Sequence, residues 1–375
     1  MSDTNAVVVK FDIEKIADSD FLSVAKLHGK EWQVVVRTDD FKDGKGVYIP
    51  LDALCDTARP EFAFLDKGKN KLHRIKTIRL RKVLSQGLLI PCPPNANVGD
   101  DLTEALGITR YEPRPPPNLQ TGQIKEPTNF DKYTSIENFK NYPRALQEGE
   151  SVRITCKIHG SNWRAGFVNG KKRGELWTKL KFSFFQKIVL FIKSLFGNKV
   201  ASLALNDMHY AVGSHRTARK EDDLNDYSNL SRDLNVKEKL AKIVKESGAK
   251  QHFIVYGELY GKGVQTLVYD AENTKKLRLF DVKIDHVFQT FEYVEKIASI
   301  LGIETVPILY RGPYSRDKVM SLRDGKDPIG NHIREGVVVT AEPERSDRGV
   351  GRVIIKFISD EYLEIANKKG WSDGH

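Results

Sequence analysis

The segment RITCKIHGSNW, residues 153–163, is the part of the chain around which the remaining motifs are arranged. Apolar and polar residues alternate from Val152 to Cys156, a pattern that predicts a strand. The strand would deliver Lys157 to a turn marked by Gly160, after which residues 163–168 are again extended in character. A lysine at a strand end, beside glycine and hydrogen-bonding side chains, is a candidate nucleophile held by a rigid sheet. Taken alone, the same pattern also fits a surface lysine in an ordinary hairpin.

Length and composition predict two domains and a polyanionic partner. A chain of 375 residues is too long for one ordinary core. An apolar content of 40% and a charged content of 29% are typical of a soluble globular protein. The net charge of +10 favours a nucleic-acid partner, because lysine and arginine gain affinity by releasing counterions from phosphates. A generally basic soluble protein is the alternative.

Cysteine usage and the N-terminus indicate the compartment. Cys55, Cys92 and Cys156 follow no paired or metal-binding spacing, which argues against a disulfide framework and for a reducing environment. The N-terminus has no basic region followed by an apolar one, so no secretory signal is predicted. We therefore expect an intracellular protein, cytoplasmic or nuclear, that is not secreted.

Residues 1–112 are predicted to form a small β-rich domain. Turn signals separate several short apolar runs, and five or six short strands with few long helices suggest a small barrel such as an OB-fold. The predicted strands cover residues 7–13, 33–37, 46–49, 71–80 and 87–91.

Residues 67–82 are basic without an acidic residue among them. In a strand, alternate side chains share one face, so these residues would form a positive stripe suited to a phosphate backbone. A solvated hairpin is the alternative. The residues predicted to contact nucleic acid are Lys71, Arg74, Lys76, Arg79 and Arg81.

The sequence EPRPPP, residues 112–117, marks a domain boundary. Consecutive prolines exclude a helix or a central strand and favour a semi-rigid spacer. We therefore predict a linker over residues 113–125 and a second domain over 126–375. Within it, residues 177–199 carry apolar side chains at helical spacing but are too short and too charged to span a bilayer. Packing in the core or between domains is predicted there, with a membrane-surface helix as the alternative.

Further strand ends in the second domain carry one charged or aromatic residue each, as the strand before Lys157 does. Every one of these short motifs is weak alone, but five in order over about two hundred residues are a strong signal. The set is Lys157-Ile158-His159-Gly160, Tyr256-Gly257-Glu258-Leu259, Leu279-Phe280-Asp281-Val282, Glu335-Gly336-Val337-Val338 and Ile355-Lys356-Phe357.

This ordered set resembles the covalent nucleotidyltransferases, which include ATP-dependent RNA and DNA ligases and mRNA capping enzymes. His159, followed by Ser161 and Asn162, resembles RNA ligases, because the other two groups tend to carry aspartate there. The N-terminal region looks like the OB-type domain that precedes the core in one branch of nick-sealing RNA ligases. The resemblance implies an α+β fold: a small OB-like β-barrel, then a nucleotidyltransferase domain of antiparallel sheets flanked by helices.

The resemblance also implies an activity, the ATP-dependent joining of 3′-hydroxyl and 5′-phosphate ends of RNA at nicks. Lys157 would attack the α-phosphorus of ATP and form lysyl-AMP. AMP would then move to a 5′-phosphate, and a 3′-hydroxyl would expel it. Because an ammonium has no lone pair, neighbouring positive charge and a bound cation are expected to depress the pKa of Lys157.

Roles for the other motif residues follow from the same resemblance. Lys356 would stabilise charge on the phosphoryl oxygens, and Glu335 would hold Mg²⁺ or Mn²⁺, directly or through water. Glu258 would accept a hydrogen bond from the ribose, and Phe280 would stack on adenine. Further nucleotide contacts are expected from Ile158, His159, Asn162 and Arg216.

The last motif departs from the family pattern. Many relatives carry two lysines separated by one residue, whereas Lys356 has Ile354 before it and Ile358 after it, so Arg352 could supply the missing cation. Two alternatives to an RNA ligase are a capping-type guanylyltransferase, which would use GTP, and a catalytically inactive nucleic-acid-binding protein. We expect RNA or a nicked RNA/DNA duplex as partner, no membrane, and a monomeric protein.

Overall fold

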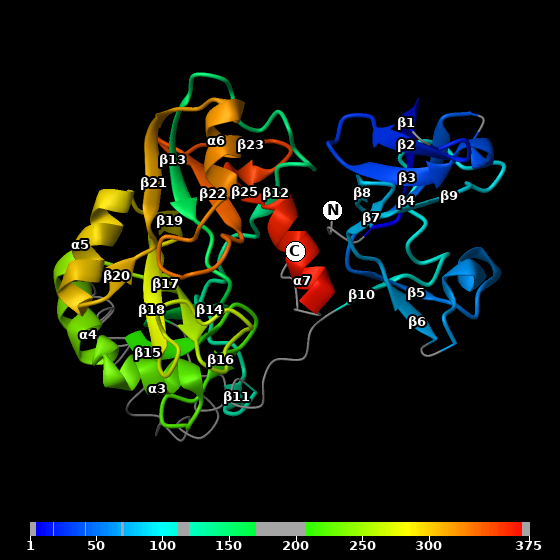
Figure 1. Cartoon of the computed structure of the whole chain (residues 1–375). Helices are drawn as coiled ribbons and strands as arrows, with labels where there is room; N and C mark the ends of the chain where they lie inside the picture. Colours follow the sequence, from blue (N-terminus) through cyan, green and yellow to red (C-terminus); the bar gives the residue numbers. More distant parts are fainter. Residues whose placement is uncertain are drawn as a thin grey trace, which may run out of the picture.

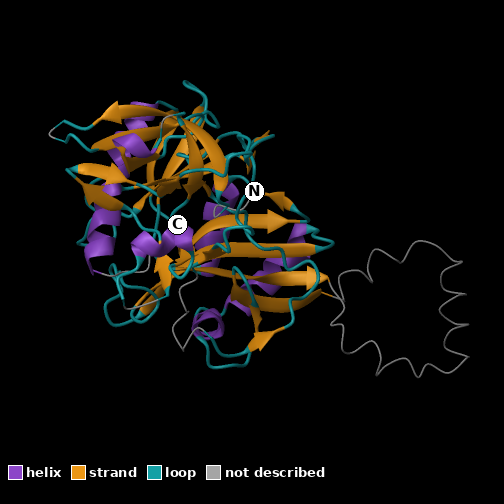
Figure 2. Ribbon diagram, turned by 90° about the vertical axis from the view of Figure 1, so that its right-hand side faces the viewer, coloured by secondary structure: helices purple, strands orange, loops and turns teal. Residues whose placement is uncertain are grey.

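The computed structural model describes residues 5–17, 19–41, 43–68, 71–111, 120–169 and 208–369. Residues 113–119 of the predicted linker lie outside these ranges, and so do residues 177–199, for which helical spacing was noted. Strands form the bulk of the described fold (Figure 2). Figure 1 shows a strand-rich N-terminal part beside a larger C-terminal part, with helix α7 (Asp360–Lys369) between them.

The N-terminal part is built on a five-stranded antiparallel sheet with strand order β3-β2-β1-β4-β9. Strand β1 pairs with two neighbours, with β4 through residues 7–10 and with β2 through residues 11–15. One buried apolar cluster, which includes Val8, Val34 and Val47, fills the interior. The strands of this sheet are β1 (Val7–Lys15), β2 (Leu22–Leu27), β3 (Gln33–Arg37), β4 (Lys45–Ile49) and β9 (Leu88–Ile90).

A three-stranded sheet, β10-β5-β6, and the β7-β8 hairpin complete the N-terminal part. Its remaining elements are η1 (Thr38–Asp40), β5 (Ala53–Asp56), η2 (Pro60–Leu65), β6 (Leu72–Arg74), β7 (Ile78–Leu80), β8 (Val83–Ser85) and β10 (Thr109–Arg110).

The prediction of one strand over residues 71–80 is wrong. Ile75 and Thr77 are buried in the gap between β6 and β7, and the Ile75 N–H donates to the carbonyl of Ala53. The basic side chains therefore do not form one alternating stripe: Arg74 pairs with Asp52, and Arg79 pairs with Glu364. Of the other predicted nucleic-acid contacts, Lys71 and Arg81 are exposed and Lys76 is half-buried.

Two sheets organise the C-terminal part. The larger has the order β11-β16-β15-β14-β17-β18-β19, with β20 added to β18, and the smaller has the order β12-β25-β22-β13-β21. Pairing is antiparallel except where the short strands β12 and β20 join. The strands of the larger sheet are β11 (Gln123–Ile124), β14 (Ser161–Asn169), β15 (Met208–Ser214), β16 (Ala218–Arg219), β17 (His252–Gly261), β18 (Lys275–Ile284), β19 (Val287–Phe288) and β20 (Glu304–Thr305).

Apolar residues of both sheets and of the helices share the interior. A cluster that includes Val168 and Ile254 of the larger sheet also contains Ile354 of the smaller one. The strands of the smaller sheet are β12 (Glu137–Asn138), β13 (Ser151–Cys156), β21 (Ile308–Pro313), β22 (Gly336–Ala341) and β25 (Ile354–Ile358). Outside the sheets lie α3 (Asp226–Asp233), α4 (Val236–Ser247), α5 (Phe291–Leu301), α6 (Arg316–Arg323) and the hairpin of β23 (Ser346–Asp347) and β24 (Gly351–Arg352).

The Lys157 segment is the crossing point between the two sheets. Strand β13 belongs to the smaller sheet and β14 to the larger one, so the turn between them is not an ordinary hairpin. Gly160 is required in this turn, because a Cβ atom at that position would lie 2.3 Å from the carbonyl oxygen of Leu259. Among the described residues, no helix has the length and apolar character needed to cross a bilayer.

Candidate active site

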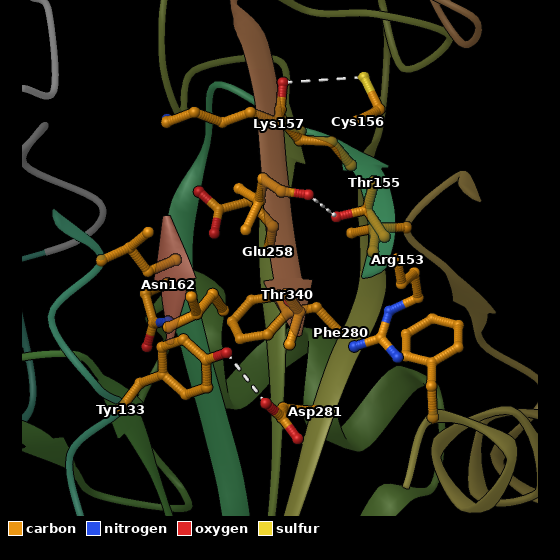
Figure 3. Close-up of a pocket in the computed structure, with 16 residues that line it drawn as sticks. Tyr133, Arg153, Thr155, Cys156, Lys157, Asn162, Glu258, Phe280, Asp281 and Thr340 are labelled. Atoms are coloured by element: carbon orange, nitrogen blue, oxygen red, sulfur yellow. Dashed lines mark hydrogen bonds between the residues drawn. The ribbon is translucent and has the colours of Figure 1, made fainter. Parts of the chain in front are cut away.

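A pocket lies between the two sheets of the C-terminal part, at the crossing from β13 to β14. The smaller sheet contributes Arg153, Thr155 and Thr340 to its walls, and the larger sheet contributes Asn162, Glu258 and Phe280. Figure 3 shows Lys157 and Cys156 at one end, Tyr133 and Asp281 at the other, and the side chains of Glu258 and Phe280 between them. The two sheets therefore enclose a site that reaches from a lysine to a buried carboxylate.

Strand alternation explains which side chains of the smaller sheet face this pocket. Arg153, Thr155 and Lys157 are two positions apart from one another along the chain, so their side chains point to the same side of the sheet. Thr155 pairs with Val338, and Val338 pairs with Lys356 on the next strand. Lys356 is buried and does not line the pocket itself, but it is on the same face of the sheet as the pocket-lining residues Thr155 and Val338.

Lys157 forms an ion pair with Glu335. The Lys157 Nζ atom lies 2.7 Å from Oε1 of Glu335, whose side chain is almost fully buried. Backbone hydrogen bonds fix both residues, because Lys157 N–H donates to the carbonyl of Gly336 and Ser359 N–H donates to that of Glu335. The pair is therefore held by the register of β22 and β25 against the end of β13.

The ion pair sets the protonation of both partners. Burial lowers the pKa of Lys157, but the charge and hydrogen bond of Glu335 outweigh burial and leave it raised. Burial raises the pKa of Glu335, but the charge of Lys157 lowers it to about 2. The pKa of Lys157 is thus raised by its neighbour Glu335, whereas the depressed pKa expected from the sequence depended on neighbouring positive charge and a bound cation.

The second oxygen of Glu335 fits a hard cation. Oε2 is buried and has no hydrogen-bond partner, and Nδ1 of His159 is 3.7 Å away. A buried carboxylate oxygen without a donor is an unusual and costly arrangement. Such an oxygen is the kind of ligand that Mg²⁺ and Mn²⁺ prefer. His159 itself is buried and reaches Tyr362, whose hydroxyl is 3.3 Å from Nδ1.

Glu258 and Asn162 lie side by side on β17 and β14, where they form a directly opposed pair. Burial raises the pKa of Glu258 to about 8; the charge of Lys157 opposes the shift and that of Glu335 adds to it. The carboxyl group is therefore mostly protonated at neutral pH. Asn162 Oδ1 is buried without a hydrogen-bond partner, so both residues offer polar atoms to a molecule in the pocket.

Phe280 reaches the pocket because of a β-bulge. Tyr256 pairs with Asp281 and Gly257 pairs with Leu279, so Phe280 is the extra residue between two pairs. A bulge redirects a side chain, and here the consecutive residues Phe280 and Asp281 both line the pocket. The Phe280 ring packs edge-on against Tyr133, with 4.8 Å between ring centroids. The aromatic wall is therefore fixed in position.

The structure brings together most of the residues predicted from the motifs. Lys157, Ile158, Asn162, Glu258 and Phe280 line the pocket. Glu335 and His159 lie behind Lys157.

Arg216 is an exception among the predicted nucleotide contacts. It is exposed in the turn between β15 and β16 and does not line the pocket, because the β15–β16 hairpin carries it outward.

Arg352 and Arg153 behave differently from the sequence-based expectation. The guanidinium of Arg352 donates to the buried Asp281 over 2.6 Å and also pairs with the exposed Glu344, so its ion pairs are with these two carboxylates. Arg153 lines the pocket, although no role was predicted for it. The signal for it was its spacing of four residues from Lys157, which places both side chains on one face.

We predict that Glu258→Gln stabilises the chain more at high pH than at low pH. The folded chain binds the Glu258 proton more tightly than the unfolded chain, whose glutamate pKa is about 4.5. The wild-type free energy of unfolding therefore falls as pH rises from about 4.5 through about 8, and glutamine removes this loss. Denaturant unfolding without nucleotide or metal should show a gain about 1–2 kcal/mol larger at pH 9 than at pH 6.

The control for this measurement is Glu246→Gln, an exposed glutamate on α4. Its effect on the free energy of unfolding should be the same at both pH values. An equal effect of Glu258→Gln at pH 6 and pH 9 would show that Glu258 titrates as an ordinary surface carboxyl group.

Comparison with known proteins agrees with this geometry. Residues 150–358 match the RNA ligase family model, and residues 6–92 match a model of an OB-fold domain. Naegleria gruberi RNA ligase with PPi has a similar fold, with a TM-score of 0.72 and 23% identity, covering 98% of this chain and 100% of that chain. A mutant of the same Naegleria gruberi ligase, solved with ATP and Mn, has a TM-score of 0.73 and 22% identity, covering 96% of this chain and 98% of that chain. No curated protein matches the chain in sequence.

The matched family region contains Lys157, Glu258, Phe280, Glu335 and Lys356, so it includes most of the pocket lining and the ion pair beside it. The fold agrees with the expected one, an N-terminal OB-fold followed by sheets with few helices. The chain therefore belongs to the RNA ligase family of enzymes, with an OB-fold domain ahead of the ligase region.

Proposed function

We propose that this RNA ligase seals nicks with ATP, through a lysyl-AMP intermediate on Lys157. The observation that supports the proposal most strongly is the 2.7 Å contact between Lys157 Nζ and Glu335 at the end of the pocket. It places a primary amine beside a buried carboxylate and next to a cavity with one aromatic wall. This is the set of groups needed for a covalent adenylate: a nucleophile, a charge that controls its proton, and a surface for the base.

In the first step, the lone pair of the Lys157 amine attacks the α-phosphorus of ATP. The bond from that phosphorus to the bridging oxygen breaks, and pyrophosphate leaves. The lysine must first lose the proton that its contact with Glu335 stabilises. Mg²⁺ or Mn²⁺ bound at Oε2 of Glu335 would draw the carboxylate's charge away from Lys157 and favour the free amine.

Different residues of the pocket walls would contact the base, the ribose and the phosphates of the nucleotide. Phe280 from the larger sheet and Val338 from the smaller sheet line the same pocket, and a flat purine ring would lie against the Phe280 ring. Glu258 lies between Phe280 and Lys157, where the ribose would be, and the side chain of Asn162 lies level with Phe280, near Tyr133 (Figure 3). A protonated Glu258 would donate a hydrogen bond to a ribose oxygen, whereas an ionised one would accept. Lys356, with Ile158 and His159, would assist at the phosphate end.

Transfer to the nick completes the reaction. AMP would pass from Lys157 to the 5′-phosphate of one strand, and the 3′-hydroxyl of the other strand would attack that activated phosphate and release AMP. The Naegleria gruberi ligase structures were solved with PPi, ATP and Mn, and with AMP and Mn, which supports this chemistry for a protein of the same fold. The OB-fold domain would hold the duplex, with Lys71 and Arg81 among its exposed cations.

We further propose domains over residues 1–112 and 126–375 with a linker over 113–125, and a monomeric, intracellular protein. In support, one apolar cluster is confined to residues between Ala6 and Ile108. The three cysteines are free, as expected in a reducing compartment. Sealing of nicked duplexes, with RNA and DNA exchanged strand by strand, tests the substrate. A chain that accepts AMP from ATP but seals no nicked duplex would contradict the nick-sealing part.

We predict that Lys157→Ala abolishes covalent labelling by [α-³²P]ATP. The variant should still join a nick that already carries a 5′-adenylate, because that step needs no lysyl-AMP. The wild type should take label from ATP and not from [α-³²P]GTP, which separates the proposal from a capping-type guanylyltransferase. Lys242→Ala, an exposed lysine on α4, should label as the wild type does. Label on the Lys157→Ala chain would identify another nucleophile.

We predict that Phe280→Ala weakens ATP binding by about 5- to 150-fold, since stacking of a base on an aromatic ring contributes about 1–3 kcal/mol. Phe280→Tyr keeps the ring and should bind within about threefold of its parent. Binding is measured by equilibrium titration in a Lys157→Ala background, so that no covalent adduct forms. Equal affinity of the alanine variant and its parent would place the base elsewhere.

A further inference from the structure

Helix α7 makes contacts on two different faces. Its buried residues Tyr362, Leu363 and Ala366 pack into the interior of the C-terminal part. Asp360, Glu364 and Asn367 follow a spacing of four and three residues, which places them together on another face of the helix. The helix begins two residues after β25, so its start is tied to the smaller sheet. Figure 1 shows α7 between the two parts of the molecule.

The second face of α7 is docked on the OB-fold domain. Glu364 pairs with Arg79, and the side-chain amide of Asn367 donates to the carbonyl of Thr77. Asp360 accepts from Gln86 over 3.3 Å and from Lys140 over 3.1 Å. The buried Lys140 ammonium also donates to Gln86 over 2.6 Å, which closes a network between the OB-fold domain, α7 and the ligase region.

The first face of α7 reaches the active site. The Tyr362 hydroxyl is 3.3 Å from Nδ1 of His159, and this nitrogen is 3.7 Å from Oε2 of Glu335. Ser359, one residue before the helix, donates its N–H to the carbonyl of Glu335 over 2.9 Å. The helix therefore contacts the OB-fold domain on one side and His159 on the other, and the residue before it contacts Glu335.

We propose that α7 is a positioning element, through which docking of the OB-fold domain holds Tyr362 against His159 and keeps Glu335 aligned with Lys157. A helix of ten residues is marginal by itself and takes its stability from what it packs against. Loss of the docked face should therefore loosen the opposite one. In this proposal Tyr362 acts through His159 and does not contact the substrate. Arg79, which was predicted to contact nucleic acid, instead links the OB-fold domain to α7.

A charge exchange across the docked face tests the proposal. The variants are Arg79→Glu, Glu364→Arg and the two together, all in the full chain. Each single change should increase amide exchange at least threefold in peptides covering residues 157–163, as measured by hydrogen–deuterium exchange without nucleotide. The double variant restores opposite charges and should exchange within twofold of wild type. Glu361→Arg, an exposed residue of the same helix, is the matched control and should have no effect.

The rate of lysyl-AMP formation is the second readout and rests on the proposed function. Each single charge change should slow labelling at least threefold, and the double variant should recover. Tyr362→Phe keeps the ring and removes the hydroxyl, so it should slow labelling at least threefold with an unchanged melting temperature. Wild-type exchange of residues 157–163 in both single variants, or no recovery in a folded double variant, would overturn the proposal. An unlabelled wild type would instead contradict the proposed function, and the exchange readout would still test α7.

Discussion

The structure depends on keeping one buried ion pair, Lys157 with Glu335, intact between two sheets. Glu335 is almost fully buried, and Lys157 is the cation that compensates its charge. The chain meets this requirement with backbone geometry. Gly336 accepts from the Lys157 N–H, Ser359 donates to the Glu335 carbonyl, and Gly160 lets β14 leave the turn close to Leu259. Lys157 is therefore placed by strand register more than by its own flexible side chain.

The same sheets that hold the ion pair also shape the pocket beside it. A regular β18 would send Phe280 and Asp281 to opposite faces, and the bulge opposite Tyr256 places both in the pocket. Asp281 forms an ion pair with Arg352 and accepts a hydrogen bond from the Tyr133 hydroxyl. This buried network fixes the residue next to Phe280, so the aromatic wall and the ion pair are both positioned before any nucleotide binds.

The motifs predicted much of this site from sequence, because their strands flank the crossing of the two sheets. Lys157 and Glu335 stand at the ends of β13 and β22, whereas Glu258 and Phe280 lie within β17 and β18. Lys157, Glu258, Phe280 and Glu335 were found in this way. What sequence could not show depends on tertiary partners. The pair of Arg79 with Glu364 joins residues 285 positions apart. The break after Arg74 arises because Ile75 is buried against β5. The raised pKa of Lys157 follows from a carboxylate whose position only the folded sheets define.

Peptide mapping after incubation with ATP and Mg²⁺ tests the assignment of the adenylate to the amine paired with Glu335. We expect one added AMP per chain, located by mass spectrometry on Lys157 and absent from the Lys157→Ala chain. An adduct on Lys356 or on any other residue, with Lys157 unmodified, would contradict it.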